Sequence, residues 1–365
     1  MSEWKEIKLE DFASLKYGKL PPKEIVPSGY PIWSGYKYVG SAETFNCPKD
    51  TPIVVARGVG GTGDVKIAKE DCFLTNLSIS VSLKEEICNP HFFTYYFAKD
   101  NLRYLDSGSA QSQITIDALK KVILKLPPLQ QQKKIVAVLS SLDEKIETNR
   151  KINTRLEELA QALFKSWFID FEPFGGQMPK DWKTGILSDI ANIVMGQSPK
   201  GECINSNQHG MIFYQGKTEF GDRFPSVKNF TTNITRVAPV NSVLLSVRAP
   251  VGDVNITLNE CCIGRGIASI DYKYGSNSFL FLLLKNKTDY FDIFDKGGTV
   301  FGCINKKSLE EMPIFLPTTS TIASFNEILH PIDVELERRN NESARLAALR
   351  DTLLPKLMSR ELKPE

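Results

Sequence analysis

Hydrophobic and polar positions in residues 126–171 follow the three-and-four spacing of one face of a helix. No proline or glycine interrupts residues 130–167, so this stretch can form a single helix of roughly 57 Å, at about 1.5 Å per residue. The apolar or small positions of the seam are Ile135, Leu139, Leu142, Ile146, Leu156, Ala160, Leu163 and Trp167, and the polar Asn149 and Asn153 share the rhythm. Such a seam is typical of a helix that packs against a second long helix.

A second stretch near the end of the chain repeats the first. Leu126-Pro127 corresponds to Leu316-Pro317, and the same offset in residue number relates every later position of the first seam to a position of the second without a gap. The equivalent positions are Phe325, Leu329, Ile332, Leu336, Arg339, Ser343, Leu346, Arg350, Leu353 and Leu357. The chain is therefore an internal repeat with one long helix in each copy.

The residues before each long helix carry short β patterns. Residues 51–57 predict a buried strand, and residues 64–81 alternate as two further strands after a glycine-rich turn. Asn89 is typical of an N-cap, and Pro90 follows it at the first position of a helix. In the second copy, residues 243–253 parallel this first strand and turn. Each copy therefore predicts a mixed α/β domain with a strongly β centre.

The attachment of the helices predicts the topology. Each long helix follows a globular domain, and the second domain begins where the first helix ends, so antiparallel helices join all four segments without a long return loop. We predict an α+β fold with two mixed α/β, β-rich domains, separated by two long antiparallel coiled-coil helices and related by a pseudo-two-fold axis. The four segments are residues 1–126 (first domain), 127–172 (first helix), 173–316 (second domain) and 317–365 (second helix).

Polar residues interrupt the two seams at corresponding places. Asn149 and Asn153 in the first helix correspond to Arg339 and Ser343 in the second. Polar seam residues can fix the register of a coiled coil at some cost in stability, or they can be merely tolerated. The sequence leaves both interpretations open.

Composition is that of an ordinary globular protein, with 365 residues of which 42% are hydrophobic and 24% charged. We find neither a signal-peptide pattern nor an apolar run of membrane-spanning length, so we expect a cytoplasmic protein without a membrane partner. The seven cysteines have no Cys-x-x-Cys spacing and three histidines accompany them, so we expect a reduced, metal-free chain. The net charge of +2 is low for a protein that binds DNA alone. If DNA is the partner, other subunits must supply many of the phosphate contacts.

Two stretches imitate catalytic motifs, and neither fits its context. Residues 58–63 spell the dinucleotide fingerprint, but that fingerprint must open a helix, whereas strands are predicted to follow it here. Residues 89–92, NPHF, are similar to the tetrapeptide with which amino-methyltransferases hold a flipped base, yet no glycine-rich S-adenosylmethionine motif accompanies them. Walker, zinc-protease and nucleophile-elbow motifs are absent from the sequence. We therefore predict no catalytic residue and no cofactor bound by this chain.

Several motifs together closely resemble the specificity subunit of type I restriction-modification enzymes, over essentially the whole chain. Residues 126–135 and 139–146 are similar to that family's central conserved region, 165–171 to its end, 196–199 and 213–216 to the opening of a target-recognition domain, and 107–111 to its close. Two features depart from the family pattern. Gln131 stands where glutamate is common, and residues 316–322 have lost most of the corresponding element.

The resemblance implies a mechanism. Each globular domain would be a target-recognition domain that reads one half of a bipartite, asymmetric site in double-stranded DNA, and the helices would set the unread gap. Two methyltransferase subunits would dock along the helices with S-adenosylmethionine and the adenine-N6 chemistry. Restriction subunits would add ATP- and Mg-dependent translocation and cleavage.

Candidate DNA readers are polar residues in or beside glycine-rich turns, where a loop can enter a groove. Arginine pairs bidentately with guanine, and glutamine with adenine. Each candidate could instead be a solvated loop residue or make a structural hydrogen bond, and the matching of Arg57 with Arg248 favours a shared structural or phosphate role for that pair. The candidates are Tyr36, Lys37, Arg57, Gln111 and Gln113 in the first domain, and Gln197, Tyr214, Gln215, Lys217, Arg248, Arg265 and Lys296 in the second.

Three other function classes compete with this interpretation. The first is another binding module: a stand-alone DNA-binding or anti-restriction protein, or the target-recognition subunit of a related non-type-I system. The second is a structural coiled-coil adaptor, against which the unlike loops of the two copies argue. The third is an enzyme, against which the failed motifs argue. Neighbouring genes for a methyltransferase and a helicase-nuclease would discriminate among them.

Overall fold

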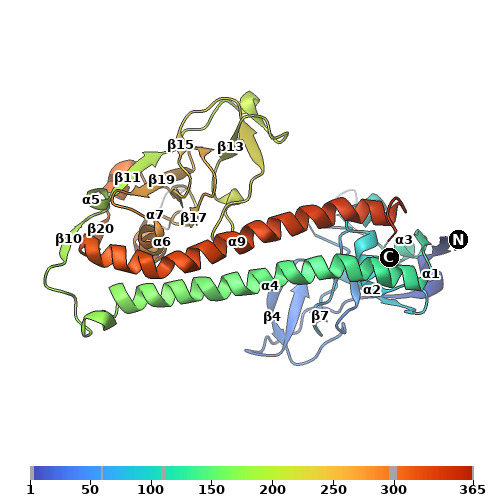
Figure 1. Ribbon diagram of the computed structural model, residues 1–365. Helices are drawn as coiled ribbons and strands as arrows, with labels where there is room; N and C mark the ends of the chain where they lie inside the picture. The colour runs from blue at the N-terminus through green and yellow to red at the C-terminus, as the bar shows by residue number, and fades with distance from the viewer. Residues whose placement is uncertain (1–3, 59–60, 108–111, 296–301, 364–365) are drawn as a thin grey trace. The chain divides into compact units, whose positions relative to one another are not determined.

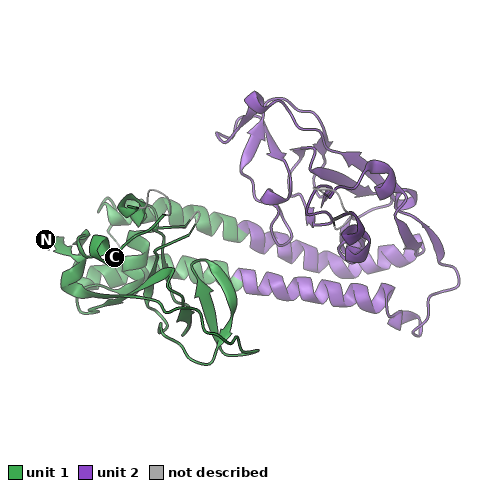
Figure 2. Cartoon of the chain, turned by 180° about the vertical axis from the view of Figure 1, so that it is seen from behind, with its two compact units in different colours: residues 1–148, 342–365 green, residues 149–341 purple. Residues whose placement is uncertain are grey.

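The computed structural model describes residues 4–58, 61–107, 112–295 and 302–363. The chain divides into two compact units, residues 1–148 with 342–365 and residues 149–341 (Figure 2). Each unit contains a β-rich globular part and a portion of both long helices. Because this division cuts through the helices, the four predicted segments stay a prediction.

Within its described residues, the first unit contains three small sheets and four short helices. β1 pairs antiparallel with β9, the second sheet has the order β2-β8-β5-β6, and the third has the order β4-β3-β7. The strands are β1 (Lys5–Lys8), β2 (Ala13–Tyr17), β3 (Tyr30–Ser34), β4 (Lys37–Ala42), β5 (Pro52–Val55), β6 (Val65–Ile67), β7 (Phe73–Leu74), β8 (Ser78–Leu83) and β9 (Ile123–Leu126). The helices are α1 (Leu9–Phe12), α2 (Pro90–Tyr96), η1 (Leu102–Leu105) and α3 (Ile116–Lys120).

The second unit repeats this plan. β10 pairs with β20, the second sheet has the order β11-β19-β16-β17, and the third has the order β12-β14-β13-β18-β15. The strands are β10 (Lys183–Ile186), β11 (Ala191–Met195), β12 (Ile204–Asn205), β13 (Met211–Tyr214), β14 (Asn229–Thr231), β15 (Val237–Ala238), β16 (Val243–Ser246), β17 (Val254–Ile256), β18 (Cys261–Ile263), β19 (Ile267–Tyr272) and β20 (Pro313–Leu316). The helices are η2 (Glu172–Phe174), α5 (Leu187–Ile190), η3 (Gly201–Cys203), η4 (Lys217–Glu219), α6 (Ser278–Lys285), α7 (Thr288–Asp295) and α8 (Lys306–Glu310).

Equivalent strands pair in the same sense in the two units. β3 and β7 run parallel in the first unit, as β13 and β18 do in the second. β5 lies between β8 and β6, as β16 lies between β19 and β17. The internal repeat is therefore confirmed. The pairings of β12 with β14 and of β15 with β18 correspond to isolated β-bridges in the first copy, Val26 with Ser41 and Cys47 with Cys72.

The helix start and the glycine-rich turn that the sequence predicts in the first unit are both present in the structure. The Asn89 side chain accepts a hydrogen bond from the Phe92 N–H at 3.1 Å, and Pro90 opens α2, so this helix start is confirmed. The glycine-rich stretch leads into β6 rather than into a helix. Gly63 has φ +95°, and a Cβ there would lie 2.3 Å from the Arg103 backbone nitrogen, so this turn requires glycine.

The two long helices are α4 (Leu129–Phe168) and α9 (Thr319–Met358), coloured green and red in Figure 1. In the first unit, Arg350 of α9 donates to Asp143 of α4 at 2.7 Å, and Glu342 lies 3.6 Å from Lys145. In the second unit, Arg339 of α9 donates to Asn149 of α4 at 3.0 Å.

In the second unit, aromatic side chains of α4 and α9 are also in contact. The ring centroids of Phe168 and Phe325 lie 4.8 Å apart. Residue numbers therefore rise along α4 as they fall along α9 within each unit. The α+β class and the antiparallel pairing of the long helices are confirmed.

The predicted seam positions line the faces of the helices that are turned inward. Ile135 and Leu139 belong to the core of the first unit with Leu354 and Leu357, and Leu329, Ile332 and Leu336 belong to the core of the second. The half-buried seam positions are Leu142, Ile146, Asn153, Leu156, Leu163, Trp167, Arg339, Ser343, Leu346, Arg350 and Leu353. Asn149 is fully buried, and its side-chain oxygen accepts a hydrogen bond from the guanidinium of Arg339. At this position the polar seam residues therefore make a specific hydrogen bond between the two helices.

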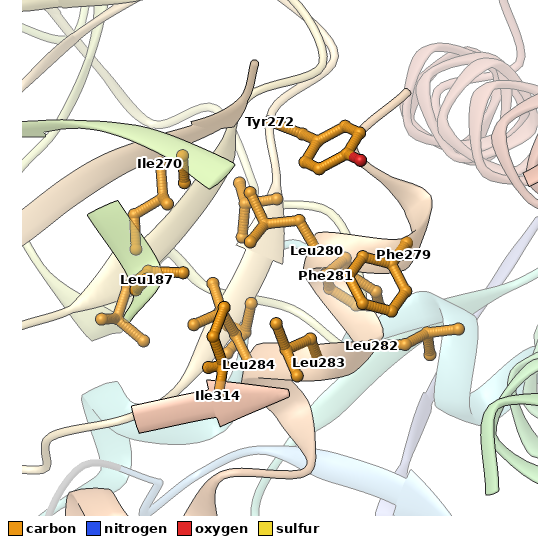
Figure 3. Packing of buried hydrophobic residues seen from close by; sticks show 14 of the residues in the cluster. Leu187, Ile270, Tyr272, Phe279, Leu280, Phe281, Leu282, Leu283, Leu284 and Ile314 are labelled. Carbon is orange, nitrogen blue, oxygen red and sulfur yellow. The ribbon is translucent and has the colours of Figure 1, made fainter. Parts of the chain in front are cut away.

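The core of the second unit is built around α6. Residues from Phe279 to Leu284 are all buried on this helix, because β-strands cover it on one side and the long helices on the other. Figure 3 shows these side chains beside Leu187, Ile270, Tyr272 and Ile314. The apolar faces of α4 and α9 thus form part of this core.

The aromatic contacts between α4 and α9 predict a large effect of Phe325→Ala. The side chain is fully buried and its ring also lies 5.5 Å from that of Trp167, so its removal leaves a cavity in the helix pair. We expect a loss of about 3–5 kcal/mol in the free energy of unfolding, measured with urea by circular dichroism. Ile328→Ala on the same helix, where the side chain is 42% exposed, is the control and should change stability far less. Equal losses for the two variants would contradict the packing.

Candidate nucleic-acid interface

The turn between β18 and β19 gathers predicted reader residues of the second domain. The Gln197 N–H donates to the Ile263 carbonyl at 2.9 Å, and the Arg265 N–H donates to the Ser198 hydroxyl at 3.2 Å. The strand before Gln215 is joined to the same turn, because the Gly264 N–H donates to a β13 carbonyl at 2.8 Å. Gln197, Gln215 and Arg265 are all exposed. The structure therefore brings these three together on one surface, which we call the β18 turn.

Glycines allow the backbones of the β18 turn to approach closely. A Cβ at Gly196 would lie 2.2 Å from the Gly264 carbonyl oxygen, and a Cβ at Gly266 would lie 2.6 Å from the Gln215 carbonyl oxygen. Both distances are too short for a real Cβ contact, so larger residues would push the three segments apart. The positions of the exposed side chains are therefore set by the backbone beneath them.

Two further predicted cations lie beside this turn. The Val247 N–H donates to the Gly266 carbonyl at 2.9 Å, and the next residue, Arg248, is exposed. Arg248 also pairs with Cys303 as an isolated β-bridge. Lys217 lies 2.5 Å from Asp253 in a partly exposed ion pair, which lowers the charge that it offers to a phosphate.

Tyr214 does not belong to this exposed group. Its side chain is 1% exposed and packs with Ala238, Leu244 and Ile263 in a small core. Burial also raises the pKa of its hydroxyl. The Tyr214 ring therefore lies in this core. That Tyr214 reads DNA stays a prediction, and in this structure its side chain is buried.

The first unit has an equivalent turn, formed by residues 74–77 after β7. The Lys19 N–H donates to the Leu74 carbonyl at 3.0 Å, and the Thr75 N–H donates to the Trp33 carbonyl at 3.0 Å. Lys19 and Asn76 occupy the places of Gln197 and Arg265, and the sequence analysis missed both. The signal was the parallel between Gly18 and Gly196: a Cβ at Gly18 would lie 2.2 Å from the Thr75 carbonyl oxygen.

The predicted residues of the first domain fall into two places. Arg57 and Gln113 face each other as an isolated β-bridge, and the Gln113 N–H donates to Asp106 at 2.8 Å. Tyr36 and Lys37 lie instead at the start of the β4 hairpin strand, and both are exposed. Gln111 and Lys296 lie outside the described residues.

A lysine and an acid hold the Tyr36 ring in place. The Tyr36 hydroxyl donates to Asp64, and Lys66 Nζ lies 3.5 Å above the centre of the ring. Burial lowers the pKa of Lys66. These two contacts fix the position of the ring, and its role in DNA contact stays a prediction.

A family model for the type I restriction modification DNA specificity domain matches residues 1–158 and again residues 179–345. The chain belongs to this family. The two matches agree with the two structural copies, so each unit of this specificity protein contains most of one family domain.

Named relatives of this specificity protein come from archaea and bacteria. A provisionally named MjaX specificity subunit of a type I restriction enzyme from Methanocaldococcus jannaschii is 34% identical over 275 residues, which cover 69% of this chain and 64% of that protein. The HindI specificity subunit from Haemophilus influenzae is 26% identical over 334 residues, which cover 68% of this chain and 71% of that protein. The match to the first relative thus spans less than two thirds of its length.

A solved structure shares the fold of this specificity protein. The S subunit of a type I restriction-modification system from M. genitalium superposes with a TM-score of 0.67 and covers 98% of this chain and 96% of its own. The sequence identity is 20%, so the likeness concerns the fold.

Within the described ranges, no group of three or more His, Cys, Asp or Glu side chains is placed to hold a metal ion. No helix among the same residues has the length and apolar character needed to cross a bilayer.

The cysteine environments predict a graded reaction with the thiol reagent DTNB. Burial raises the pKa of the Cys88 and Cys261 thiols to about 12, so both stay protonated and covered, whereas Cys303 is exposed. At about pH 8 we expect fast reaction at Cys303 and none at Cys88 or Cys261 until urea unfolds the chain, because the thiolate is the reactive form. The released chromophore is followed by absorbance. Cys303→Ser should remove the fast phase, and an unchanged fast phase in that variant would contradict the assignment.

Proposed function

We propose that this specificity protein is the DNA-recognition subunit of a type I restriction-modification complex, and that each β-rich domain reads one half of a bipartite, asymmetric site. The observation that carries the proposal is the repeated turn. The two copies have the same hydrogen bonds between backbone groups but present Lys19 and Asn76 in the first unit, and Gln197 and Arg265 in the second. Two domains with the same backbone structure but different exposed polar side chains are suited to recognise two different half-sites.

The side chains at the two turns have the chemistry that base recognition uses. Arginine offers two parallel donors to guanine, and glutamine offers one donor and one acceptor to adenine. Gln215 and Arg265 are exposed at a turn whose backbone positions are fixed. We propose them as the principal readers in the second domain. The candidates in the first domain are Asn76, which corresponds to Arg265, and Arg57, which corresponds to Arg248.

Partner subunits would supply the chemistry and much of the charge. A net charge of +2 over 365 residues supports a complex in which other chains make many of the phosphate contacts. We propose two methyltransferase subunits that carry S-adenosylmethionine, together with restriction subunits that use ATP and Mg. The long helices offer docking surfaces, since Leu159, Val334 and Leu349 are between 46% and 50% exposed.

The predicted segments acquire roles in this proposal. Residues 1–126 and 173–316 would be the two target-recognition domains, and residues 127–172 and 317–365 would be the helices that set the unread gap between the half-sites. The proposal places the protein in the cytoplasm, where the host DNA is methylated.

The proposal predicts a bipartite methylation pattern in the source genome. Deletion of the gene should abolish adenine methylation at one split, asymmetric motif, because no other subunit would read it. Single-molecule sequencing of wild-type and deletion strains measures this directly. A pattern that is identical in the two strains would contradict the proposal.

The chain on its own should bring about no reaction on DNA. Incubated with DNA and S-adenosylmethionine, or with DNA, ATP and Mg, the purified chain should neither transfer a methyl group nor cut, whereas addition of the methyltransferase subunits should restore methylation. Radiolabel transfer and gel electrophoresis are the measurements. Methylation by the chain alone would overturn the non-catalytic role.

Gln215→Ala should relax base preference in one half-site. Loss of one bidentate pair removes about 1–3 kcal/mol of discrimination at a single base position. Binding of the reconstituted methyltransferase complex to duplexes that vary at each position of both half-sites gives the measurement. Gln177→Ala, at another exposed glutamine of the second unit, is the matched control. If preference at every position were unchanged in Gln215→Ala, this residue would be no reader.

A further inference from the structure

Arg223 is a buried cation that reaches both long helices from the globular part of the second unit. It lies in the loop between η4 and β14, and it is 5% exposed. Its Nη1 donates to Glu157 of α4 at 2.5 Å, and its Nη2 donates to Asp333 of α9 at 2.5 Å. One side chain of the globular part thus joins the two helices at once.

The partners of Arg223 are themselves held by the globular part. Lys285 of α6 donates to the second oxygen of Glu157 at 3.3 Å, and the Ser278 hydroxyl donates to the second oxygen of Asp333. The guanidinium lies 4.4 Å from the centre of the Phe281 ring. We call Arg223, Glu157, Asp333, Lys285 and Ser278 the charge cluster of the second unit.

The backbone ties this loop to the β-sheet. The Ile256 N–H donates to the Arg223 carbonyl at 2.8 Å, so the loop is attached directly to β17. Charged hydrogen bonds depend on direction, whereas an apolar contact tolerates sliding. Removal of one member would leave the others buried without their partner, which disfavours rotated arrangements of the domain on the helices.

The first unit lacks this arrangement at the equivalent place. The repeat offset takes Asp333 onto Asp143, which accepts from Arg350 of α9 at 2.7 Å and from the Tyr95 hydroxyl at 2.6 Å. The guanidinium there comes from a helix and not from the globular part. The same offset takes Glu157 onto Ala347, so the second acid has no counterpart in α9. The charge cluster therefore belongs to the second copy and is not explained by the internal repeat.

We infer that Arg223 is a positioning residue that fixes the orientation of the second recognition domain on the paired helices, and thereby the gap between half-sites that the complex accepts. This inference rests on the proposed function. A domain held at one angle presents its β18 turn to one phase of the DNA helix. A domain that can rotate accepts its half-site when the gap is one base pair shorter or longer.

The test compares gap selectivity with base selectivity in the reconstituted methyltransferase complex. Duplexes carry the mapped half-sites with the natural gap or with a gap changed by one base pair, and kcat/KM for methyl transfer is measured on each. In Arg223→Met the ratio of natural to altered gap should fall about tenfold, because loss of orientation lets the domain reach displaced sites. Discrimination against altered bases within the half-sites should stay at the wild-type level.

Matched variants separate positioning from general stability. Arg338→Met removes an arginine that is 55% exposed on α9 and pairs with Glu335 one turn away, and it should leave gap selectivity unchanged. Arg223→Lys keeps the charge but reaches one acid, and it should restore part of the selectivity. Should Arg223→Met fail to fold, Ser278→Ala provides a milder change in the same cluster, with a smaller loss of gap selectivity expected.

Each outcome decides the inference. Wild-type gap selectivity in a folded Arg223→Met variant, or in Ser278→Ala where Arg223→Met does not fold, overturns it while leaving the proposed function intact. Parallel loss of base and gap selectivity also overturns it, because the residue would then be merely structural. A wild-type complex that ignores both half-sites would overturn the proposed function and, with it, this inference.

Discussion

Burial of the inner faces of α4 and α9 is the constraint on which the other features depend. Neither helix can leave Phe164, Phe168 or Phe325 in water without losing most of its stabilisation, because a long isolated helix gains little from its backbone hydrogen bonds alone. In each unit, the apolar faces of both helices are buried in the core of a β-rich domain. The helices are therefore part of each domain's interior as well as partners of one another.

A shared scaffold with variable surfaces follows from how the two turns are built. At Gly18 and Gly196 the close contacts are between backbones, so the side chains at Asn76 and Arg265 carry little of the packing. Substitution at the exposed positions can alter the chemistry of the surface without disturbing the core. The interior charge cluster around Arg223 serves a different purpose, since its contacts concern the angle of the domain and not the bases.

The sequence was sufficient to predict the two long helices, because the three-and-four pattern extends over many residues and few residues interrupt it. It did not find Phe164 and Phe168, which are buried because the helix face widens where α6 packs against it. It placed Tyr214 outside because burial of a tyrosine depends on which strands flank β13, and that pairing joins distant segments. Lys19 and Asn76 were missed for a related reason. The second copy has extra residues between Gly196 and β13 and between β13 and β14, so the offset between the copies changes and the hydrogen bonds between backbone groups reveal the equivalence.

The first unit is discontinuous in the chain, and this has a consequence during synthesis. Leu354 and Leu357 are made after the whole of the second unit, and they complete a core that otherwise consists of residues from the first part of the sequence. Multidomain chains usually fold from the amino terminus as they emerge from the ribosome. Here the first unit stays partly assembled until residues 342–357 have been made, whereas all segments of the second unit are made before them. A nascent chain stalled before α9 would therefore expose Ile135 and Leu139 to chaperones.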